Sequence, residues 1–454
     1  MKSLLVSLLI GAAGFSAAAA DRPNIVFILV DDMGYADVGA MGSTDILTPN
    51  VDRLAAEGVK LSDFYANAPV CSPTRCGFIT GRWQQRVGFE WALGYTAEQE
   101  KLVDGVWTKP TDMHRAIGLP ADQPGIAKML KAAGYATGAF GKWHLGYSDE
   151  YNPLHHGFDE YFGELLGHAD YYRHIYYDGT YALREGLEIS KEKGYITDLI
   201  NQHAAAFIRK HAAAGEPFFC YVPHLAVHAP FQPPNRPDPK VTKEHMTDGS
   251  RADYKAMLEK VDEGIGMFLD ELETAGVADN TLIVFSSDNG GERWADNRPL
   301  FHHKATLWEG GIRVPCLLRW PAKLPKGKVS PQMAITMDLS ATFAAVAGAE
   351  PPAGYVLDGV NLIPMLSGEK PEVTDRSFFW RIQRSNRKMR AVRHGKWKYL
   401  DDGGTMDLLF DLENDIGERR NLNFTHPDIV ADLKKRLAEW ETEMAREPKT
   451  FFVR

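Results

Sequence analysis

Short apolar runs rich in β-branched and aromatic residues alternate along the chain with segments whose apolar residues recur at helical spacing. The clearest runs are Asn24 to Val30, Ala136 to Gly141, Phe218 to Val222, Thr281 to Ser286 and Val314 to Arg319. Each is short and almost wholly apolar, which is typical of parallel strands buried on both faces. The repeated order strand, helix, strand predicts an α/β fold with a large, mainly parallel β-sheet sandwiched by helices.

Three of the intervening segments have recognisable helix ends. Thr48 and Pro49 are suited to begin a helix that Gly58 ends, and two further helices are expected from Ile126 to Gly134 and from Ala252 to Gly276. These ends place a helix between successive strands of the predicted sheet.

Beyond Gly368 the pattern changes to closely spaced short strands. We expect them at Ser377 to Ile382, Met389 to Arg393, Lys396 to Leu400 and Leu408 to Asp411, followed by a helix from Asp428 to Met444. The pairs His394-Gly395 and Gly403-Gly404 suit the turns of antiparallel hairpins. The sequence therefore predicts a larger domain at 21–370 and a smaller C-terminal α+β subdomain with an antiparallel sheet at 371–454.

The first twenty residues have the features of a signal peptide. Lys2 precedes an apolar run from Leu4 to Phe15, and small residues from Ala17 to Ala20 suit cleavage near Asp21. The run is shorter than a bilayer span, so we expect a periplasmic or secreted protein without a stable membrane anchor.

Composition excludes one broad class of function. The chain has 454 residues, 44% of them hydrophobic, and a formal net charge of -9. Because no run of lysine or arginine stands out, nucleic acid is not an expected partner.

Two of the four cysteines are predicted to be core residues. Cys220 and Cys316 lie within apolar runs that read as buried strands. Cys71 and Cys76 remain, either as a short-loop disulfide, as small hydrophobic residues, or as a reactive site.

Polar side chains follow four of the five predicted strands. In parallel sheets the ligand crevice lies beyond the carboxyl ends of the strands, so these side chains should converge. They are Asp31, Asp32, Lys142, His144, His224, His228, Asp288 and Asn289.

Four of these residues offer only hard oxygen ligands. Asp31, Asp32, Asp288 and Asn289 suit calcium or magnesium and do not suit zinc. The alternative is that each pair caps a helix or turn. Like charges at one crevice favour the metal, because a cation would neutralise them.

An unusual number of cationic side chains accompanies this predicted metal site. Arg75, Lys142, Lys304, His144 and His228 suggest a substrate with an anionic, tetrahedral group. Four other histidines are interpreted as structural or surface residues, namely His155, His156, His302 and His303.

The segment VCSPTRCGFITGR around Cys71 resembles the signature of the type I sulfatase family, in the alkaline phosphatase superfamily. Cys71, Pro73, Arg75, Thr80 and Gly81 match its pattern. Further motifs of the family follow in order: NIVFILVDDMGYADVG, TPNVDRLAAEGVKLSDFY, GKWHLG, His-Ala-Pro, SSDNGG and the segment from Lys304 to EGGIRVP. The resemblance extends from Asn24 to about Gly368 and implies an alkaline-phosphatase-like fold.

The resemblance also implies roles for individual residues. A maturation enzyme would convert Cys71 to formylglycine, and calcium, rather than magnesium, would bind Asp31, Asp32, Asp288, Asn289 and position 71. Arg75 and Lys142 would hold position 71, with His144 beside it, while Lys304 and His228 would contact the sulfate and the leaving oxygen. Two features depart from the common pattern: Cys76 stands where a small residue is usual, and His224 in PHLAVH competes with His228.

Sulfate-ester cleavage needs a nucleophile, charge neutralisation and a proton for the leaving alkoxide. A hydrated formylglycine would attack sulfur while His228 protonates the leaving alcohol. Its second hydroxyl would then lose a proton towards His144 and expel sulfate.

Export and four aromatic residues in expected loops suit a sulfated carbohydrate substrate, although each ring is also compatible with core packing. The rings are Trp91, Tyr171, Tyr172 and Trp294. Two alternatives remain, a phosphonate monoester hydrolase or phosphodiesterase of the same superfamily, and a non-catalytic protein that binds sulfated glycans.

Overall fold

The computed structural model describes residues 22–93, 102–103, 106–107, 117–176, 179–237, 246–384, 387–403 and 406–447. The predicted signal peptide at 1–20 lies outside these residues. None of the helices in the described part of the chain has the length and apolar character needed to cross a bilayer.

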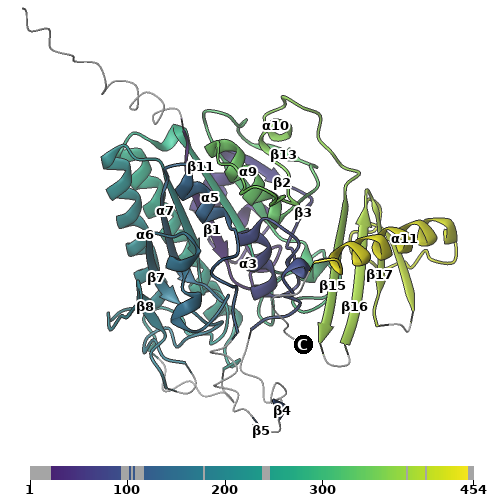
Figure 1. Ribbon diagram of the computed structural model, residues 1–454, viewed down its shortest axis with the longest axis horizontal. Coiled ribbons are helices and arrows are strands. Elements are labelled where there is room, and N and C mark those ends of the chain that lie inside the picture. Colours follow the sequence, from purple (N-terminus) through teal and green to yellow (C-terminus); the bar gives the residue numbers. More distant parts are fainter. Residues whose placement is uncertain are drawn as a thin grey trace, which may run out of the picture.

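Ten strands of the described chain form one mixed sheet (Figure 1). Their order across the sheet is β13 (Lys328–Ser330), β2 (Val59–Leu61), β12 (Cys316–Arg319), β11 (Thr281–Ser287), β1 (Asn24–Val30), β10 (Phe218–Pro223), β6 (Ala136–Lys142), β7 (Glu160–Glu164), β8 (Leu183–Glu185) and β9 (Glu188–Ile189). The central strands β11, β1, β10, β6 and β7 run parallel. The predicted α/β fold with a large, mainly parallel sheet is therefore confirmed.

One of the five predicted strands runs in an unexpected direction. β12 pairs antiparallel with β11, with Cys316 opposite Ser286. The chain between them includes α8 (Glu309–Ile312) and re-enters the sheet at the carboxyl end of β11, instead of crossing over a face. β12 is apolar because it is buried within the sheet, and that burial does not depend on its direction.

Alternating residues of β1 belong to two separate hydrophobic cores. Ile25, Phe27 and Leu29 pack on the face covered by α3 (Cys71–Thr80), α5 (Ile126–Ala132) and α9 (Thr336–Ala347). Val26, Ile28 and Val30 pack on the face covered by α2 (Pro49–Ala56), α6 (Ile196–Ala214) and α7 (Arg251–Thr274). Figure 1 shows α6 and α7 together along one flank of the sheet. The period of two in the strand thus separates the two helical layers.

The C-terminal sheet is a meander of antiparallel strands covered by one helix. It contains β15 (Ser377–Arg384), β16 (Arg387–His394), β17 (Trp397–Asp401) and β18 (Asp407–Asp411), with α11 (Pro427–Met444) packed on it. These elements agree with the predicted ones to within two residues. Trp380 and Trp440 belong to the same hydrophobic core as Phe78 and Phe343, so the two sheets share buried contacts. The boundary at 370/371 stays a prediction.

Smaller elements complete the described chain. β3 (Phe64–Tyr65) pairs with β14 (Ala334–Ile335), β4 (Leu102–Val103) pairs with β5 (Val106–Trp107), and α10 is the short helix Ile363–Leu366. Turns of 3₁₀ helix lie at Gly39–Met41, Gln84–Arg86, Asp149–Tyr151, Pro153–His156 and Ala278–Asn280.

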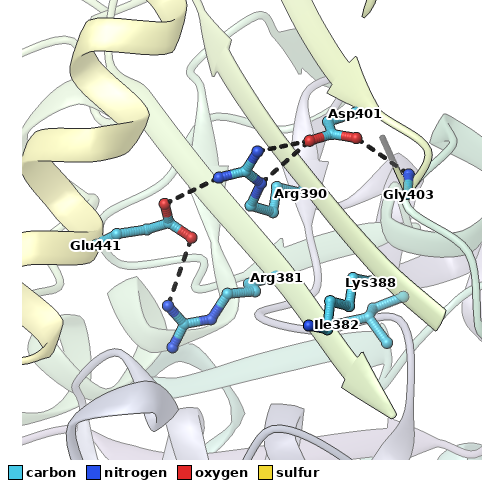
Figure 2. A pocket seen from close by; sticks show the side chains of 7 residues that line it. All are labelled: Arg381, Ile382, Lys388, Arg390, Asp401, Gly403 and Glu441. Carbon is cyan, nitrogen blue, oxygen red and sulfur yellow. Dashed lines mark hydrogen bonds and ion pairs between the residues drawn. The ribbon is translucent and has the colours of Figure 1, made fainter. Parts of the chain in front are cut away.

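A cavity of about 340 Å³ lies on the face of the C-terminal sheet (Figure 2). Arg390 is paired there with Asp401 at 2.6 Å and with Glu441 at 3.3 Å. Arg381 pairs with Glu441 at 3.5 Å and also contacts Glu90. Because these guanidinium groups are paired with carboxylates of the protein itself, the cavity has little unbalanced charge.

Candidate active site

The carboxyl ends of four parallel strands bring the predicted site residues to one edge of the main sheet. Asp31 and Asp32 follow β1, Asp288 follows β11, Lys142 ends β6, and His228 follows β10. Backbone hydrogen bonds align these ends: the amide of Asp31 donates to Ala226 at 3.0 Å, and that of Asp288 donates to Val30 at 3.1 Å. The convergence follows from the parallel order of the strands.

The acidic side chains leave oxygen atoms available for a cation. Donor atoms of Asp31, Asp32 and Cys71 all lie within 4.8 Å of one another. Asn289 Nδ2 donates to Asp32 Oδ1 at 2.7 Å, and the amide of Asp32 donates to Asp288 Oδ1 at 3.3 Å. Asp31 Oδ1 and Asn289 Oδ1 are buried and have no hydrogen-bond partner among the described residues. Unpartnered hard oxygens fit a calcium or magnesium ion.

Arg75 and Lys142 form the buried base of the site. The Nε and Nη2 atoms of Arg75 donate to Asp288 Oδ2 at 3.1 and 2.8 Å, and its Nη1 donates to the carbonyl of Lys142 at 2.7 Å. The Lys142 ammonium is paired with Asp31 Oδ2. Burial and the neighbouring Asp31 charge together raise the pKa of Asp288 to about 7, in spite of Arg75.

Lys304 and His228 meet at the opposite carboxylate. Lys304 Nζ lies 2.6 Å from Asp32 Oδ2, and His228 Nε2 lies 3.7 Å from the same oxygen. Burial opposes the ionisation of Asp32, but Lys304, His228 and Lys142 outweigh it and lower the pKa of this carboxyl. His228 is itself kept neutral, because burial and the two lysines lower its pKa to about 3.

His144 and His224 are both buried but lie in different surroundings. His144 Nε2 lies 2.5 Å from the carbonyl of Leu93, and its Nδ1 has no partner among the described residues. Burial, followed by the charge of Lys142, lowers the pKa of His144 well below its usual range. His224 has neither ring nitrogen hydrogen-bonded within the described chain, and it is His228 that approaches Asp32.

Two residues of the site, and Ala305 next to Lys304, have unusual backbone conformations. Asp32, His144 and Ala305 have φ values of 60°, 57° and 66°, in the left-handed region that non-glycine residues seldom adopt. Such strain is held by the surrounding structure and is common at functional sites.

Cys71 is the first residue of α3 and is 2% exposed. Burial and the charge of Asp31 raise the pKa of its thiol, which therefore remains protonated near neutral pH. All four cysteines, each within the described chain, are unpaired, so Cys71 and Cys76 form no disulfide. Cys220 and Cys316 are fully buried in β10 and β12, as predicted.

The sequence reasoning missed two features next to the catalytic centre. Glu164 ends β7 opposite Lys142, is 1% exposed, and has a pKa raised to about 8 by burial. The amide of Leu93 donates to Ser72 Oγ at 3.0 Å. Leu93 therefore contacts both His144 and the second residue of α3. A strand prediction for EYFGE would have placed Glu164 at the same edge as Lys142.

The residues interpreted as structural or ambiguous are distributed as follows. His156 is buried against Trp143, with ring centroids 5.1 Å apart, whereas His155, His302 and His303 are exposed. Among the four aromatic residues considered for sugar stacking, Tyr171 is fully buried, Trp91 is 9% exposed, Tyr172 is half-buried, and Trp294 is 37% exposed.

The fold and the site together define a protein of the α/β class whose buried carboxylates and cations suit the hydrolysis of a tetrahedral anionic ester. The sulfatase family model matches residues 23–349, and the model "N-sulphoglucosamine sulphohydrolase, C-terminal" matches residues 297–443. The chain belongs to the sulfatase family and is a sulfuric ester hydrolase.

Relatives with known names resemble most of the chain. The N-acetylgalactosamine-6-sulfatase of Homo sapiens is 35% identical over 470 residues, which cover 93% of this chain and 86% of that protein. Arylsulfatase J of Mus musculus is 35% identical over 363 residues, which cover 77% of this chain and 56% of that protein. The crystal structure of Ps i-CgsB in complex with k-i-k-neocarrahexaose is similar with a TM-score of 0.82, 33% identity and 95% of each chain covered.

Proposed function

We propose that this protein is an exported sulfatase that hydrolyses a sulfate ester on a carbohydrate, using a formylglycine made from Cys71 and a bound calcium ion. The observation that carries the proposal is the cluster of Cys71 with Asp31 and Asp32 at the edge of the parallel sheet.

The state of Cys71 supports its modification. As an unmodified thiol it is buried, its pKa is raised, and it is poorly suited to act as a nucleophile. A formylglycine at this position, once hydrated, would supply a nucleophilic hydroxyl. The sequence Cys71-Ser72-Pro73-Thr74-Arg75 is the pattern that a formylglycine-generating enzyme would recognise.

The unpartnered oxygens of Asp31 and Asn289 support a divalent cation. When ionised, Asp31, Asp32 and Asp288 equal in number the cations Arg75, Lys142 and Lys304 around them. Ion pairs connect these carboxylates with these cations. Calcium, held by Asp31, Asp32, Asp288, Asn289 and position 71, would add positive charge that polarises the sulfate and acidifies the nucleophile. The site would then favour an anionic ester.

The protein's own groups have distinct tasks in this proposal. Arg75 and Lys142 orient Asp288, Asp31 and position 71. Lys304 neutralises a sulfate oxygen, and His228 gives a proton to the leaving oxygen. The negative substrate would offset the lysine charges that lower the pKa of His228, and so raise it towards the range useful for an acid. The unpartnered Nδ1 of His144 is suited to accept a proton from position 71.

The names of the relatives support a carbohydrate substrate. One is an N-acetylgalactosamine-6-sulfatase, and another was crystallised with an oligosaccharide, k-i-k-neocarrahexaose. The apolar run from Leu4 to Phe15 supports export to the periplasm or the medium. These saccharides are therefore the first substrates to examine.

Mass spectrometry of the tryptic peptide from Leu61 to Arg75 tests the proposal directly, with protein from a host that matures sulfatases. We expect aldehyde oxygen in place of sulfur at position 71, and release of sulfate that is absent in Cys71→Ala. A persistent thiol would contradict the proposed nucleophile. Faster cleavage of the phosphate or phosphonate ester of the same alcohol would instead identify a phosphoester hydrolase.

A further inference from the structure

An open cavity of about 470 Å³ is formed by the loop between Asn289 and Lys304, and one of its lining residues, Glu292, lies 4.0 Å from Lys304. The ends of this loop are residues that the proposed function assigns to the metal and to the sulfate. Glu292, Arg293 and His303 are among the residues that line the cavity. Its volume is within the usual range for small-molecule sites.

Hydrogen bonds within the loop hold the cavity open in a defined shape. Asn297 braces it, because its Nδ2 donates to the carbonyl of Gly291 at 3.0 Å and its Oδ1 accepts from the amide of Gly291 at 3.0 Å. The amide of Lys304 also donates to Gly291, at 3.2 Å. The amide of Asp296 donates to the buried carboxylate of Asp37 at 3.0 Å, which ties the outer part of the loop to the main domain. A site formed in advance loses little entropy when a ligand binds.

Glu292 connects the cavity to the sulfate-binding lysine. Its Oε2 lies 4.0 Å from Lys304 Nζ, so a ligand whose sulfate contacts Lys304 has its adjoining atoms beside this carboxylate. The walls combine an acceptor, Glu292, with a donor, Arg293, and an imidazole, His303. Neighbouring hydroxyl groups of a sugar need this combination, since each hydroxyl both donates and accepts. The exposed ring of Trp294 lies in the same loop.

We propose that this cavity binds the sugar ring that bears the scissile sulfate ester. Glu292 accepts hydrogen bonds from ring hydroxyls, and Arg293 and His303 bind further oxygens of the saccharide. The inference rests on the proposed function and names the leaving-group site of the same reaction. On this inference, the residues of the loop 291–303 determine which sugar the protein accepts as substrate.

The test compares two substrates of wild type, Glu292→Gln and Arg293→Gln. One is k-i-k-neocarrahexaose or N-acetylgalactosamine 6-sulfate, whichever the wild type cleaves faster, and the other is 4-nitrophenyl sulfate, which has no sugar hydroxyls. We expect kcat/KM for the saccharide to fall about 10- to 100-fold, mainly through KM, because a charged hydrogen bond is lost. The value for the aryl ester should fall much less. Glu369→Gln, an exposed substitution away from the site, is the matched control and should leave both values unchanged.

Binding measurements keep the inference testable without turnover. In the Cys71→Ala background, calorimetry with the same saccharides should give a Kd at least tenfold higher when Glu292→Gln is added. Equal losses on both substrates would mean that these residues act on Lys304 and not on the sugar, and no loss on the saccharide would exclude the cavity. Failure of the wild type to release sulfate from any of these substrates would count against the proposed function alone, because the comparison of Kd values is independent of catalysis.

Discussion

Two clusters of buried charged residues lie in this protein, and they differ in how completely their polar atoms are paired. The catalytic cluster lies at the carboxyl edge of the main sheet, and the junction cluster lies between α8 and the C-terminal sheet. The catalytic cluster comprises Asp31, Asp32, Asp288, Asn289, Arg75, Lys142 and Lys304, and the junction cluster comprises Tyr65, Glu309, Arg313, Lys398 and Glu418.

In the junction cluster each charge has an opposite charge in contact. Lys398 Nζ lies 2.9 Å from Glu309 Oε1 and 2.8 Å from Glu418 Oε1. The other oxygen of Glu309 accepts from Tyr65 Oη at 2.6 Å and from Arg313 Nη1 at 3.2 Å. Glu418 Oε1 accepts no hydrogen bond but has the ion pair with Lys398, whereas in the catalytic cluster Asp31 Oδ1 and Asn289 Oδ1 have neither a hydrogen bond nor an ion pair within the described chain. Since unsatisfied buried polar atoms are costly, the first arrangement is typical of a structural contact and the second of a site that binds a ligand.

The largest expected effect comes from Asp31→Asn, which removes one charge from the catalytic cluster. We expect kcat/KM for an aryl sulfate to fall by about 10³-fold or more, since electrostatic stabilisation by a metal contributes several kcal/mol. Calcium at about 100 times its Kd should stabilise the wild type by about 2.7 kcal/mol, seen as a rise in Tm, and should stabilise Asp31→Asn less. Asp270→Asn, at an exposed position on α7, serves as the control. An unchanged calcium response in Asp31→Asn would mean that the unpartnered oxygen does not bind the ion.

In the junction cluster, Lys398→Met should lower stability and leave the response to calcium unchanged. Loss of the ammonium leaves Glu309 and Glu418 buried without their main counter-charge, and we expect the free energy of unfolding to fall by about 3–5 kcal/mol. Urea denaturation gives the value, and the rise in Tm with calcium should persist. Lys396→Met is the matched control, because this lysine on the turn before β17 pairs with Asp411 at 2.9 Å and is 41% exposed, so its loss should cost at most about 1 kcal/mol. Equal losses in the two variants would contradict the role given to burial.

The sequence predicted the strands, and the convergence of polar residues at the edge of the main sheet, better than it predicted the junction cluster. β1 was predicted at its observed bounds, because Asn24 and six consecutive apolar residues after it end at two aspartates. The antiparallel direction of β12 was missed, since an apolar run has the same appearance in either direction. Glu309 and Glu418 are 109 residues apart and meet only through the packing of the C-terminal sheet, which no local pattern encodes. The choice between His224 and His228 likewise required their positions relative to Asp32.

His224 and His156 are buried groups that remain neutral, unlike the charged groups of the two clusters. Their effect on the pH dependence of stability is the smallest that we predict. Burial lowers the pKa of His224 to about 3, and burial followed by the charge of Lys128 lowers that of His156 to about 3, from an ordinary value of 6.5. The unfolded chain therefore binds more protons below pH 6.5, so the stability these residues contribute is complete above that pH and is lost as pH falls towards 3.

When the pH is lowered from 7 to 5, each imidazole should decrease the free energy of unfolding by about 2 kcal/mol. In His224→Gln, which does not titrate, the free energy from urea denaturation should depend less on pH by about that amount. His155→Gln, at an exposed position beside His156, should keep the slope of the wild type. If the slope of His224→Gln also matches the wild type, this histidine is not held neutral by burial. A difference confined to His224→Gln would mean that this buried group, which has no charged partner, is tolerated because it carries no charge.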